Sequence, residues 1–338
     1  MTIRMVQYGT KHGHAAGKAR AMRTNPDVEL LGVFEPDPQA RAAARAHADY
    51  ANLRFYESAD EMLGDSSVVA VAIEGRNAES LAMARAAVDA GKHLWYDKPA
   101  GDDWPAYQEL ASRARARSLQ IQMGYMFRYH AGFRQIADWA KSGLLGDVFL
   151  VRAHMSTRIP ITSTAVPALS REGISVHRGG IFYDLAGHML DQIVWLLGRP
   201  QRAQTFLRND ATPEVPAFED NTLGVFQFER ALAFVDIAAM EARPMARRFE
   251  VYGTRGSAIM EPFEPSPALY LCLEEAVGGY HAGLQSVLLD EQPRQRLYDR
   301  ELEAFVAVLR GARQPDRSLD HEYLVQETLL RATGRISE

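Results

Sequence analysis

In the first third of the chain, short continuous apolar runs alternate with segments in which apolar residues recur every three or four positions. This pattern predicts strands and helices in alternation. Short apolar runs such as residues 68–73, rich in β-branched side chains, are typical of strands buried on both faces of a parallel sheet. Segments with apolar residues every three or four positions separate these runs and indicate helices. This order predicts a doubly wound parallel α/β sheet over residues 1–124. The predicted strands are residues 3–8, 28–34, 54–56, 68–73, 93–96 and 120–124, and the predicted helices are residues 40–48, 58–63, 78–90 and 104–118, with a first helix that ends near residue 23.

The pattern changes after residue 147, where apolar and polar residues alternate. Residues 222–228 (Thr-Leu-Gly-Val-Phe-Gln-Phe) are one example, and such alternation is typical of a sheet with one face covered. We therefore predict a second, α+β domain over residues 125–338, with an open, mainly antiparallel sheet and helices on one face. Its predicted strands are residues 148–155, 202–208, 221–228, 231–239, 247–253, 257–261 and 269–273, and its predicted helices are residues 133–142, 182–197, 291–309 and 321–332.

The predicted helix at residues 182–197 is apolar around most of its circumference and is therefore expected to be buried. Asp184, His188 and Asp191 lie on one face of it, because they are spaced by four and three residues. Buried charged groups are costly unless they are paired or used in function. The helix alone leaves two interpretations open: a structural histidine capped by two aspartates, or an imidazole that a carboxylate orients for catalysis.

Glycines follow the first predicted strand, where a doubly wound sheet of the Rossmann type binds its ligand. The segment from Gly9 to Gly17 leads into a helix, whose N-terminus favours phosphate groups. Glu35 follows the second strand, where an acidic side chain can hydrogen-bond an adenine ribose and repel a 2′-phosphate. The strict Gly-x-Gly-x-x-Gly pattern is absent, because Lys11 and His14 occupy its second and third glycine positions. We expect a dinucleotide site here, with NAD favoured and NADP as the alternative.

Lys98 follows the predicted strand at residues 93–96, at the edge of the sheet where ligands bind. Pro99 keeps Lys98 out of the helical conformation, and Asp97 is placed to orient its side chain. The ammonium group can bind a substrate hydroxyl or stabilise a developing alkoxide. An exposed surface charge is the alternative interpretation.

Composition narrows the class of protein. The 338 residues carry a formal net charge of −5 and no basic cluster with interleaved aromatic residues, which argues against a nucleic-acid partner. No run of about 18 apolar residues occurs, so we expect no membrane span. The chain opens directly into a strand, so we expect no leader either. Cys272 is the only cysteine, which favours a reducing compartment and predicts a cytoplasmic location.

Several motifs resemble those of one known family. Residues 91–99 (Gly-Lys-His-Leu-Trp-Tyr-Asp-Lys-Pro) resemble its GKHVxxEKP signature, with Asp97 in place of glutamate. Residues 179–191 resemble its GGG-x-x-x-D-x-G-x-H-x-x-D helix, and the segments 124–129, 142–146 and 252–257 resemble its domain-junction elements and its YGTKGS turn. The usual Pro-Asn…His after the fourth strand reads Gly-Arg-Asn-Ala-Glu-Ser here. The chain thus resembles the glucose-fructose oxidoreductase, inositol dehydrogenase and rhizopine catabolism (Gfo/Idh/MocA) family.

The resemblance implies a nicotinamide-dependent oxidoreductase that acts on a sugar, a polyol or a related small molecule. It implies that Lys98, Asp184 and His188 are the catalytic set and that no metal is needed. It also implies a homodimer or homotetramer that pairs through the second sheet, whose open face and edges favour association. The expected cofactor contacts are Gly9, Thr10, Lys11, His12, Gly13, His14, Glu35, Glu74, Asn77, Asp97 and Lys98, and the expected substrate contacts are Lys98, Arg128, Arg158, His177, Asp184 and His188.

Two of those substrate contacts, Arg158 and His177, come from less regular sequence. Residues 156–178 are predicted to form a long polar loop, and loops of this length are usually functional or disordered. Arg158, His177 and Arg178 are therefore candidates to contact the substrate, as is Arg128 at the predicted domain junction. For each of them a plain surface role is the competing interpretation.

Three other functions are left open by the sequence. NAD-dependent glycoside hydrolases share the family and oxidise their substrate only transiently. A dinucleotide-sensing binding protein would need no chemistry, and the altered glycine loop permits one. Asp184, His188 and Asp191, with His177, have a spacing that can also bind a metal ion.

Overall fold

The computed structural model describes residues 2–159, 174, 177–242 and 246–337. The chain forms two compact units. The first consists of Met1–Tyr125 with Arg294–Tyr323, and the second of Met126–Pro293 with Leu324–Glu338. The helix at residues 294–309 therefore belongs to the same unit as the first sheet, although 168 residues of the second unit separate it from that sheet in the sequence.

The first unit contains a six-stranded sheet with the order β3-β2-β1-β4-β5-β6, in which all paired strands are parallel. This confirms the predicted doubly wound sheet. The strands are β1 (Ile3–Tyr8), β2 (Val28–Phe34), β3 (Arg54–Phe55), β4 (Ala70–Ile73), β5 (His93–Tyr96) and β6 (Ile121–Met123), and the helices are α1 (Ala15–Thr24), α2 (Pro38–Ala46), η1 (Ala48–Tyr50), α3 (Ala59–Gly64), α4 (Ser80–Asp89), α5 (Trp104–Ala116) and α9 (Arg294–Leu309).

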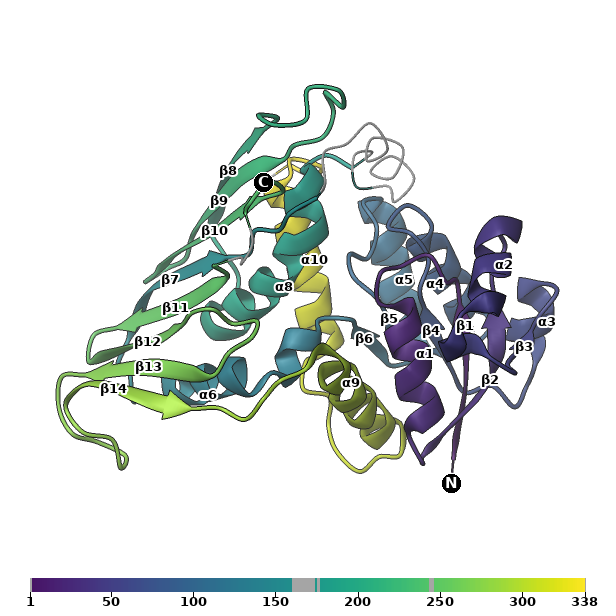
Figure 1. Ribbon diagram of the computed structural model, residues 1–338, viewed down its shortest axis with the longest axis horizontal. Helices are drawn as coiled ribbons and strands as arrows, with labels where there is room; N and C mark the ends of the chain where they lie inside the picture. The colour runs from purple at the N-terminus through teal and green to yellow at the C-terminus, as the bar shows by residue number, and fades with distance from the viewer. Residues whose placement is uncertain (1, 160–173, 175–176, 243–245, 338) are drawn as a thin grey trace. The chain divides into compact units, whose positions relative to one another are not determined.

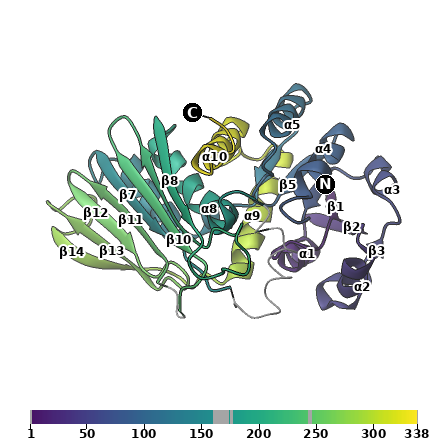
Figure 2. The same ribbon diagram turned by 90° about the horizontal axis from the view of Figure 1, so that it is seen from above.

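Helices cover both faces of this sheet, as its continuous apolar strands require. Figure 2 shows α1 and α2 on one face and α4 and α5 on the other. All four residues of β4 are buried, which fits a strand at the centre of the sheet. Helix α9 packs against α1, where a Cβ at Gly17 would lie 2.7 Å from the Tyr298 ring. A glycine is therefore needed at position 17 to let the two helices approach.

The second unit contains an eight-stranded sheet with the order β14-β13-β12-β11-β7-β10-β9-β8. Only β7 and β10 pair in parallel, and the other neighbours are antiparallel, as predicted. The elements are η2 (Met126–Tyr129), α6 (Ala131–Lys141), β7 (Val148–His154), α8 (Gly180–Leu197), β8 (Arg202–Arg208), β9 (Asn221–Gln227), β10 (Leu232–Ala238), β11 (Arg248–Gly253), β12 (Gly256–Met260), β13 (Ala268–Leu273), β14 (Gly283–Leu288) and α10 (Leu319–Ala332), the last of which crosses from one unit into the other.

Burial alternates along the central strands, so the sheet has one covered and one open face. In β10, Ala233, Val235 and Ile237 are buried, whereas Leu232 is 51% exposed. Figure 1 shows α6 and α8 along the covered face. Helix α8 is the main contact of β9 and β10 on this side, and its buried residues form the core of the unit. In the described part of the chain, no helix is both long and apolar enough to cross a membrane.

Candidate active site

Gly9 fixes the turn that follows β1. Its φ is +88°, and a Cβ at this position would lie 2.7 Å from the backbone nitrogen of Gly75 and 2.8–2.9 Å from the carbonyl group of Glu74. Any larger residue would therefore be strained and would also push apart the loops that follow β1 and β4. The Gly9 amide donates to the Phe34 carbonyl oxygen at 2.8 Å, which ties the turn to the end of β2.

Glu35, which follows β2, holds the same loop from the other side. Its carboxylate is fully buried and accepts hydrogen bonds from the amide and hydroxyl groups of Thr10 at 2.7 and 2.8 Å, and from the Asp37 amide at 3.0 Å. The predicted ribose contact of Glu35 thus lies on a side chain that also fastens Thr10. The partly exposed Asp37 stands two residues later.

Lys11, at the position of the second glycine of the strict pattern, points away along the loop edge. Its ammonium nitrogen lies 2.5 Å from Glu79 Oε1 and 3.8 Å from Asp37 Oδ2. These two acidic side chains neutralise the lysine and draw it toward the start of α4. The side chain is only 9% exposed.

Gly13 is the exposed glycine of the loop, and a Cβ on it would meet no atom within 4 Å. Helix α1 begins two residues later at Ala15, without a side-chain cap at its N-terminus. The His12 amide donates to the Glu74 carbonyl oxygen at 3.0 Å and anchors the loop beside this open position. Open space beside a glycine at an uncapped helix N-terminus fits the pyrophosphate of a dinucleotide, because backbone amides and the helix dipole favour an anion there.

His12, His14 and Lys18 converge on Asp97, directly after β5. Asp97 Oδ2 lies 3.3 Å from His12 Nδ1, 3.0 Å from His14 Nδ1 and 3.0 Å from the Lys18 ammonium nitrogen. Glu74 joins the group, 3.6 Å from His12 and 3.3 Å from Lys18. We call these five side chains the Asp97 cluster. Its three charged members are 2% exposed or less.

Burial and charge set the pKa values within the Asp97 cluster. Burial lowers the pKa of His14 to about 4, so its imidazole is neutral at pH 7. Burial raises the pKa of Glu74 well above its usual range, and Asp97 and Glu301 raise it further. Burial also disfavours charge on Asp97, but His12, His14 and Lys18 outweigh it and hold the pKa of Asp97 well below its usual range. Asp97 is therefore the ionised carboxylate of the group.

Lys98 lies at the carboxyl end of β5 and is buried, with 5% of its surface exposed. Its amide donates to Asp97 Oδ1 at 2.7 Å, so the carboxylate that binds the histidines also fixes the backbone at Lys98. Asn77 is similarly buried, in the turn that precedes α4. The expected cofactor residues of the first unit thus lie on the loops that follow β1, β2, β4 and β5.

Helix α8 carries the candidate residues of the second unit. Two glycines start it: φ is +98° at Gly179 and +45° at Gly180, and a Cβ on Gly180 would lie 2.4 Å from the Glu219 carbonyl oxygen. His188 is 2% exposed, and its ring lies 5.2 Å from that of Phe127 in an edge-on contact. Asp184, one turn earlier, is only partly buried, so the helix presents a carboxylate beside a buried imidazole.

Asp191 has a different role from its two neighbours on the helix. It is completely buried and pairs with Arg128 of η2, whose Nη2 and Nε atoms lie 2.7 and 3.0 Å from Asp191 Oδ1. The Gln192 amide also donates to Asp191 at 2.9 Å. These bonds use Asp191 to fasten η2 to α8, which counts against the metal site considered for Asp184, His188 and Asp191. They also give Arg128 an internal partner rather than an open position.

The two other expected substrate contacts have separate surroundings. His177 is buried and stacks on Tyr183 of α8, with ring centroids 4.6 Å apart and planes 24° apart. Arg158 is exposed and forms an isolated bridge with Met240. Most of the predicted loop at residues 156–178 lies outside the described residues.

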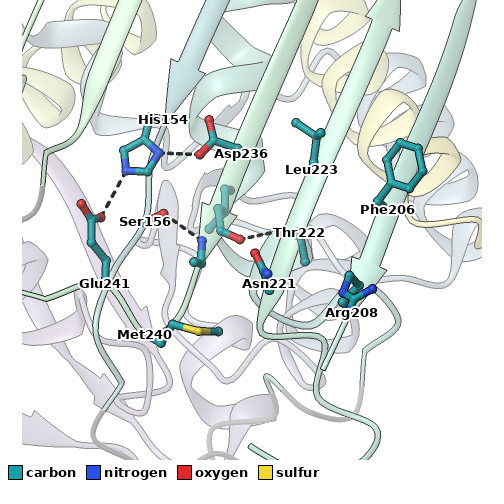
Figure 3. A pocket seen from close by; sticks show the side chains of 12 residues that line it. His154, Ser156, Phe206, Arg208, Asn221, Thr222, Leu223, Asp236, Met240 and Glu241 are labelled. Carbon is teal, nitrogen blue, oxygen red and sulfur yellow. Dashed lines mark hydrogen bonds and ion pairs between the residues drawn. The ribbon is translucent and has the colours of Figure 1, made fainter. Parts of the chain in front are cut away.

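Sequence reasoning missed Lys18, Glu301 and a hollow on the open face of the second sheet. Lys18 was detectable as a lysine among Ala15, Ala19 and Met22 on the buried side of α1. The hollow, of about 450 Å³, lies over the ends of β7 to β10, where Figure 3 shows His154 between Asp236 and Glu241. Its polar residues occur on strands whose open faces carry many polar side chains, so no pattern in the sequence distinguishes it.

A doubly wound sheet with a glycine turn and an open helix N-terminus, joined to an open mixed sheet, defines a class of two-unit dinucleotide-binding proteins. Residues 5–125 match the oxidoreductase family model with an NAD-binding Rossmann fold, and residues 133–259 match the GFO/IDH/MocA C-terminal domain. The chain belongs to the Gfo/Idh/MocA family of oxidoreductases.

Relatives and solved structures agree with this assignment. The uncharacterized oxidoreductase YhhX of Escherichia coli is 28% identical over 62% of this chain and 58% of its own length. The 1,5-anhydro-D-fructose reductase of Ensifer adhaerens is 24% identical over 76% of this chain and 74% of its own length. An oxidoreductase structure from Erwinia carotovora has the same fold, with a TM-score of 0.81 and 19% identity over 99% of each chain. The chain therefore spans less than two thirds of the length of the first of these relatives.

Proposed function

We propose that this protein transfers a hydride between NAD and a hydroxyl-bearing carbon of a sugar, a polyol or a related small molecule. The observation that carries the proposal is helix α8, where the partly exposed Asp184 lies one turn from the buried imidazole of His188. A buried imidazole on a rigid helix with a carboxylate beside it is suited to accept a proton from a hydroxyl group. The relative that reduces 1,5-anhydro-D-fructose supports a carbohydrate-like substrate.

In this proposal three residues act on the substrate. His188 accepts the hydroxyl proton when a hydride leaves the same carbon, and Asp184 orients the imidazole or binds the neighbouring hydroxyl group. Lys98 stabilises the negative charge that develops on the oxygen. The nicotinamide supplies the hydride acceptor. Arg158 and His177 are further candidates to bind the substrate, whereas the buried pair with Asp191 favours a positioning role for Arg128, which holds η2 against the catalytic helix.

The cofactor would be held by the loops of the first unit. Gly13 and the N-terminus of α1 would face the pyrophosphate, and His12 and His14 would border it. Gly9, Thr10 and Glu35 would keep this loop in place, and Glu35 would also bind the ribose. Lys11, Glu74, Asn77, Asp97 and Lys98 would complete the surroundings. Acidic residues at the end of β2 favour NAD over NADP, although Lys11 provides a compensating charge.

We also propose that two copies pair through the open face of the second sheet, as dimers or as part of a tetramer. The proposal is supported by exposed apolar side chains on that unit, including Phe206 at 54% and Leu232 at 51%. Apolar side chains this exposed on a sheet are typical of an association surface. The chain has a single cysteine and so cannot form an internal disulfide. This supports a cytoplasmic location, because proteins of reducing compartments rarely contain disulfides.

The test is a substrate screen with matched variants. The wild-type protein is incubated with NAD and a panel of sugars, polyols and sugar acids, and NADH formation is followed by absorbance. We expect His188→Asn and Lys98→Met each to lower turnover by roughly 10²–10⁴-fold, as is typical for positioned acid–base and charge-stabilising groups. Control variant His281→Ala, at an exposed histidine, is expected to turn over at the wild-type rate. Unchanged rates in both site variants would contradict the proposal.

A further inference from the structure

The Asp97 cluster has a composition that neither the sequence motifs nor the proposed hydride transfer explains. His12, His14 and Asp97 form a group of metal-ligating side chains whose ligand atoms all lie within 4.8 Å of one another. The two histidine side chains are 9% and 12% exposed, and that of Asp97 is 2% exposed. Two imidazoles and a carboxylate are a ligand set that transition metals prefer over Mg²⁺ or Ca²⁺.

The distances from Asp97 to the two histidines match those around a tetrahedral ion. Zinc binds histidine nitrogen and carboxylate oxygen at about 2.0–2.2 Å, which places neighbouring ligand atoms of a tetrahedron about 3.4 Å apart. His14 Nδ1 and His12 Nδ1 lie 3.0 and 3.3 Å from Asp97 Oδ2. Metal binding would replace the hydrogen bond between His14 Nδ1 and Asp97, and the one of 3.2 Å from the His14 amide to His12 Nδ1.

Asp97 supplies the negative charge that a cation would need. It is the ionised carboxylate of the Asp97 cluster and is 2% exposed. Lys18 would be the outer partner of the site, and it keeps its contact with Glu74 at 3.3 Å.

The packing around Asp97 is tight. A Cβ at Gly124 would lie 2.8 Å from Asp97 Oδ1 and 2.9 Å from the Lys18 ammonium nitrogen. The His12 amide donates a hydrogen bond to the Glu74 carbonyl oxygen, and the Lys98 amide donates one to Asp97. These bonds fix the loops that carry His12 and Asp97.

We propose that His12, His14 and Asp97 bind one divalent transition-metal ion, preferentially zinc, with the fourth position open to water. The ion would join the loop after β1 to the end of β5. Such a link would fix the loop that lacks two of the usual glycines, so its role would be structural and separate from hydride transfer.

The experiment measures metal binding by the whole protein. Chelator-treated protein is titrated with Zn²⁺ alone, and bound metal is counted by mass spectrometry after gel filtration. We expect one equivalent per chain, and a melting temperature that rises with Zn²⁺ concentration. Asp97→Asn and His12→Asn are expected to lose at least tenfold in affinity. Control variant His281→Ala, which removes an exposed histidine, is expected to bind Zn²⁺ like the wild type.

Co²⁺ provides a second readout that needs no variant. The wild-type protein with one equivalent of Co²⁺ is expected to show the intense visible absorption of tetrahedral coordination, which Zn²⁺ then displaces. This result supports the proposal even if the variants do not fold. Absence of stoichiometric Zn²⁺ and of the Co²⁺ spectrum, or full binding by both site variants, would overturn it and leave the Asp97 cluster as a hydrogen-bonded network. NADH binding is measured separately by fluorescence. It tests the cofactor site of the proposed function, whatever the outcome of the metal titration.

Discussion

Asp97 links two features of the chain that look unrelated in the sequence. The altered glycine loop places His14 where a glycine is usual, and the signature after β5 has aspartate where glutamate is usual. In the structure His14 Nδ1 lies 3.0 Å from Asp97 Oδ2, so the two departures form one contact. The shorter acidic side chain leaves space for the imidazole, and Lys18 compensates the buried charge.

Gly9 and Gly13 provide a matched pair of substitutions at the residue scale. Gly9→Ala places a Cβ 2.7 Å from the Gly75 nitrogen at a φ of +88°, so we expect a lower melting temperature and weaker NADH binding. Gly13→Ala meets no neighbouring atom, so we expect an unchanged melting temperature and a loss confined to NADH affinity. Thermal unfolding and NADH fluorescence measure the two effects. Equal melting temperatures for the two variants would contradict this account of Gly9.

The buried pair of Arg128 and Asp191 permits a stability test. Arg128→Met leaves a fully buried carboxylate without its guanidinium partner, which typically costs about 3–5 kcal/mol of unfolding free energy. Replacing both residues, as in Arg128→Met with Asp191→Leu, is expected to recover a large part of that loss, because no unpaired charge is left. Urea unfolding gives the free energies. A double variant as unstable as the single one would contradict this, because the loss would then not come from an unpaired buried charge.

At the scale of elements, hydrophobic periodicity predicted nearly every strand. β1, β2, β5 and β8 have the predicted bounds, because each is a short apolar or alternating run between turn residues. β14 (Gly283–Leu288) was missed. It is an edge strand with mostly exposed residues, Leu284 at 67% and Leu288 at 82%, so it lacks the buried face on which pattern reasoning depends. Helix ends moved by a few residues, because caps such as Asp37 and His130 act through local hydrogen bonds.

Site residues were predictable where they follow a strand or a helical spacing, as Lys98 and His188 do. Partners that depend on three-dimensional packing were not. The spacing on α8 grouped Asp191 with His188. In the structure Asp191 instead forms an ion pair with Arg128, which is 63 residues away in the sequence. Glu35 was picked out by its place after β2, but its hydrogen bonds with Thr10 and Asp37 could not be predicted. A sequence pattern does not predict which carboxylate oxygen accepts a hydrogen bond from a residue far away in the chain.

The strand pair β7 and β10 predicts a pH effect. His154 of β7 donates to Asp236 of β10 at 2.5 Å and also faces Glu241, while Arg248 lies opposite it on β11. The hydrogen bond to Asp236 is the largest cause of a raised pKa at His154, and the charges of Asp236 and Glu241 add to it. Because the folded protein holds this proton more tightly than the unfolded chain, the added stability is fully present below about pH 6.5 and is lost as pH rises through the folded-state pKa.

Chemical unfolding between pH 6 and pH 9 checks this effect. We expect the wild type to lose more stability over this interval than His154→Gln, which has no titrating imidazole between the two carboxylates. The difference between the two curves isolates the contribution of His154, since other groups titrate in both proteins. Parallel curves for the two proteins would contradict the assignment.

At the scale of the whole molecule, the open face of the second sheet predicts association. Leu232 lies on the open face of β10 and is 51% exposed, so a charge there would be buried without a partner in a paired assembly. We expect the wild type to be a dimer or tetramer and Leu232→Arg to shift it toward the monomer. Ser112→Arg, on the exposed side of α5, is the matched control and is expected to keep the wild-type assembly. Sedimentation velocity gives the masses, and a monomeric wild type would contradict the proposal.

The proposed reaction requires Lys98 and His188 to act in the same chemical step. A kinetic double-mutant cycle tests this requirement most directly, because residues that act together on one step are strongly non-additive. Turnover of the best substrate is measured for the wild type, Lys98→Met, His188→Asn and the double variant. The account predicts that each single variant loses most of the activity and that the double variant is scarcely slower than either. Losses that multiply, or a single variant with wild-type turnover, would contradict it.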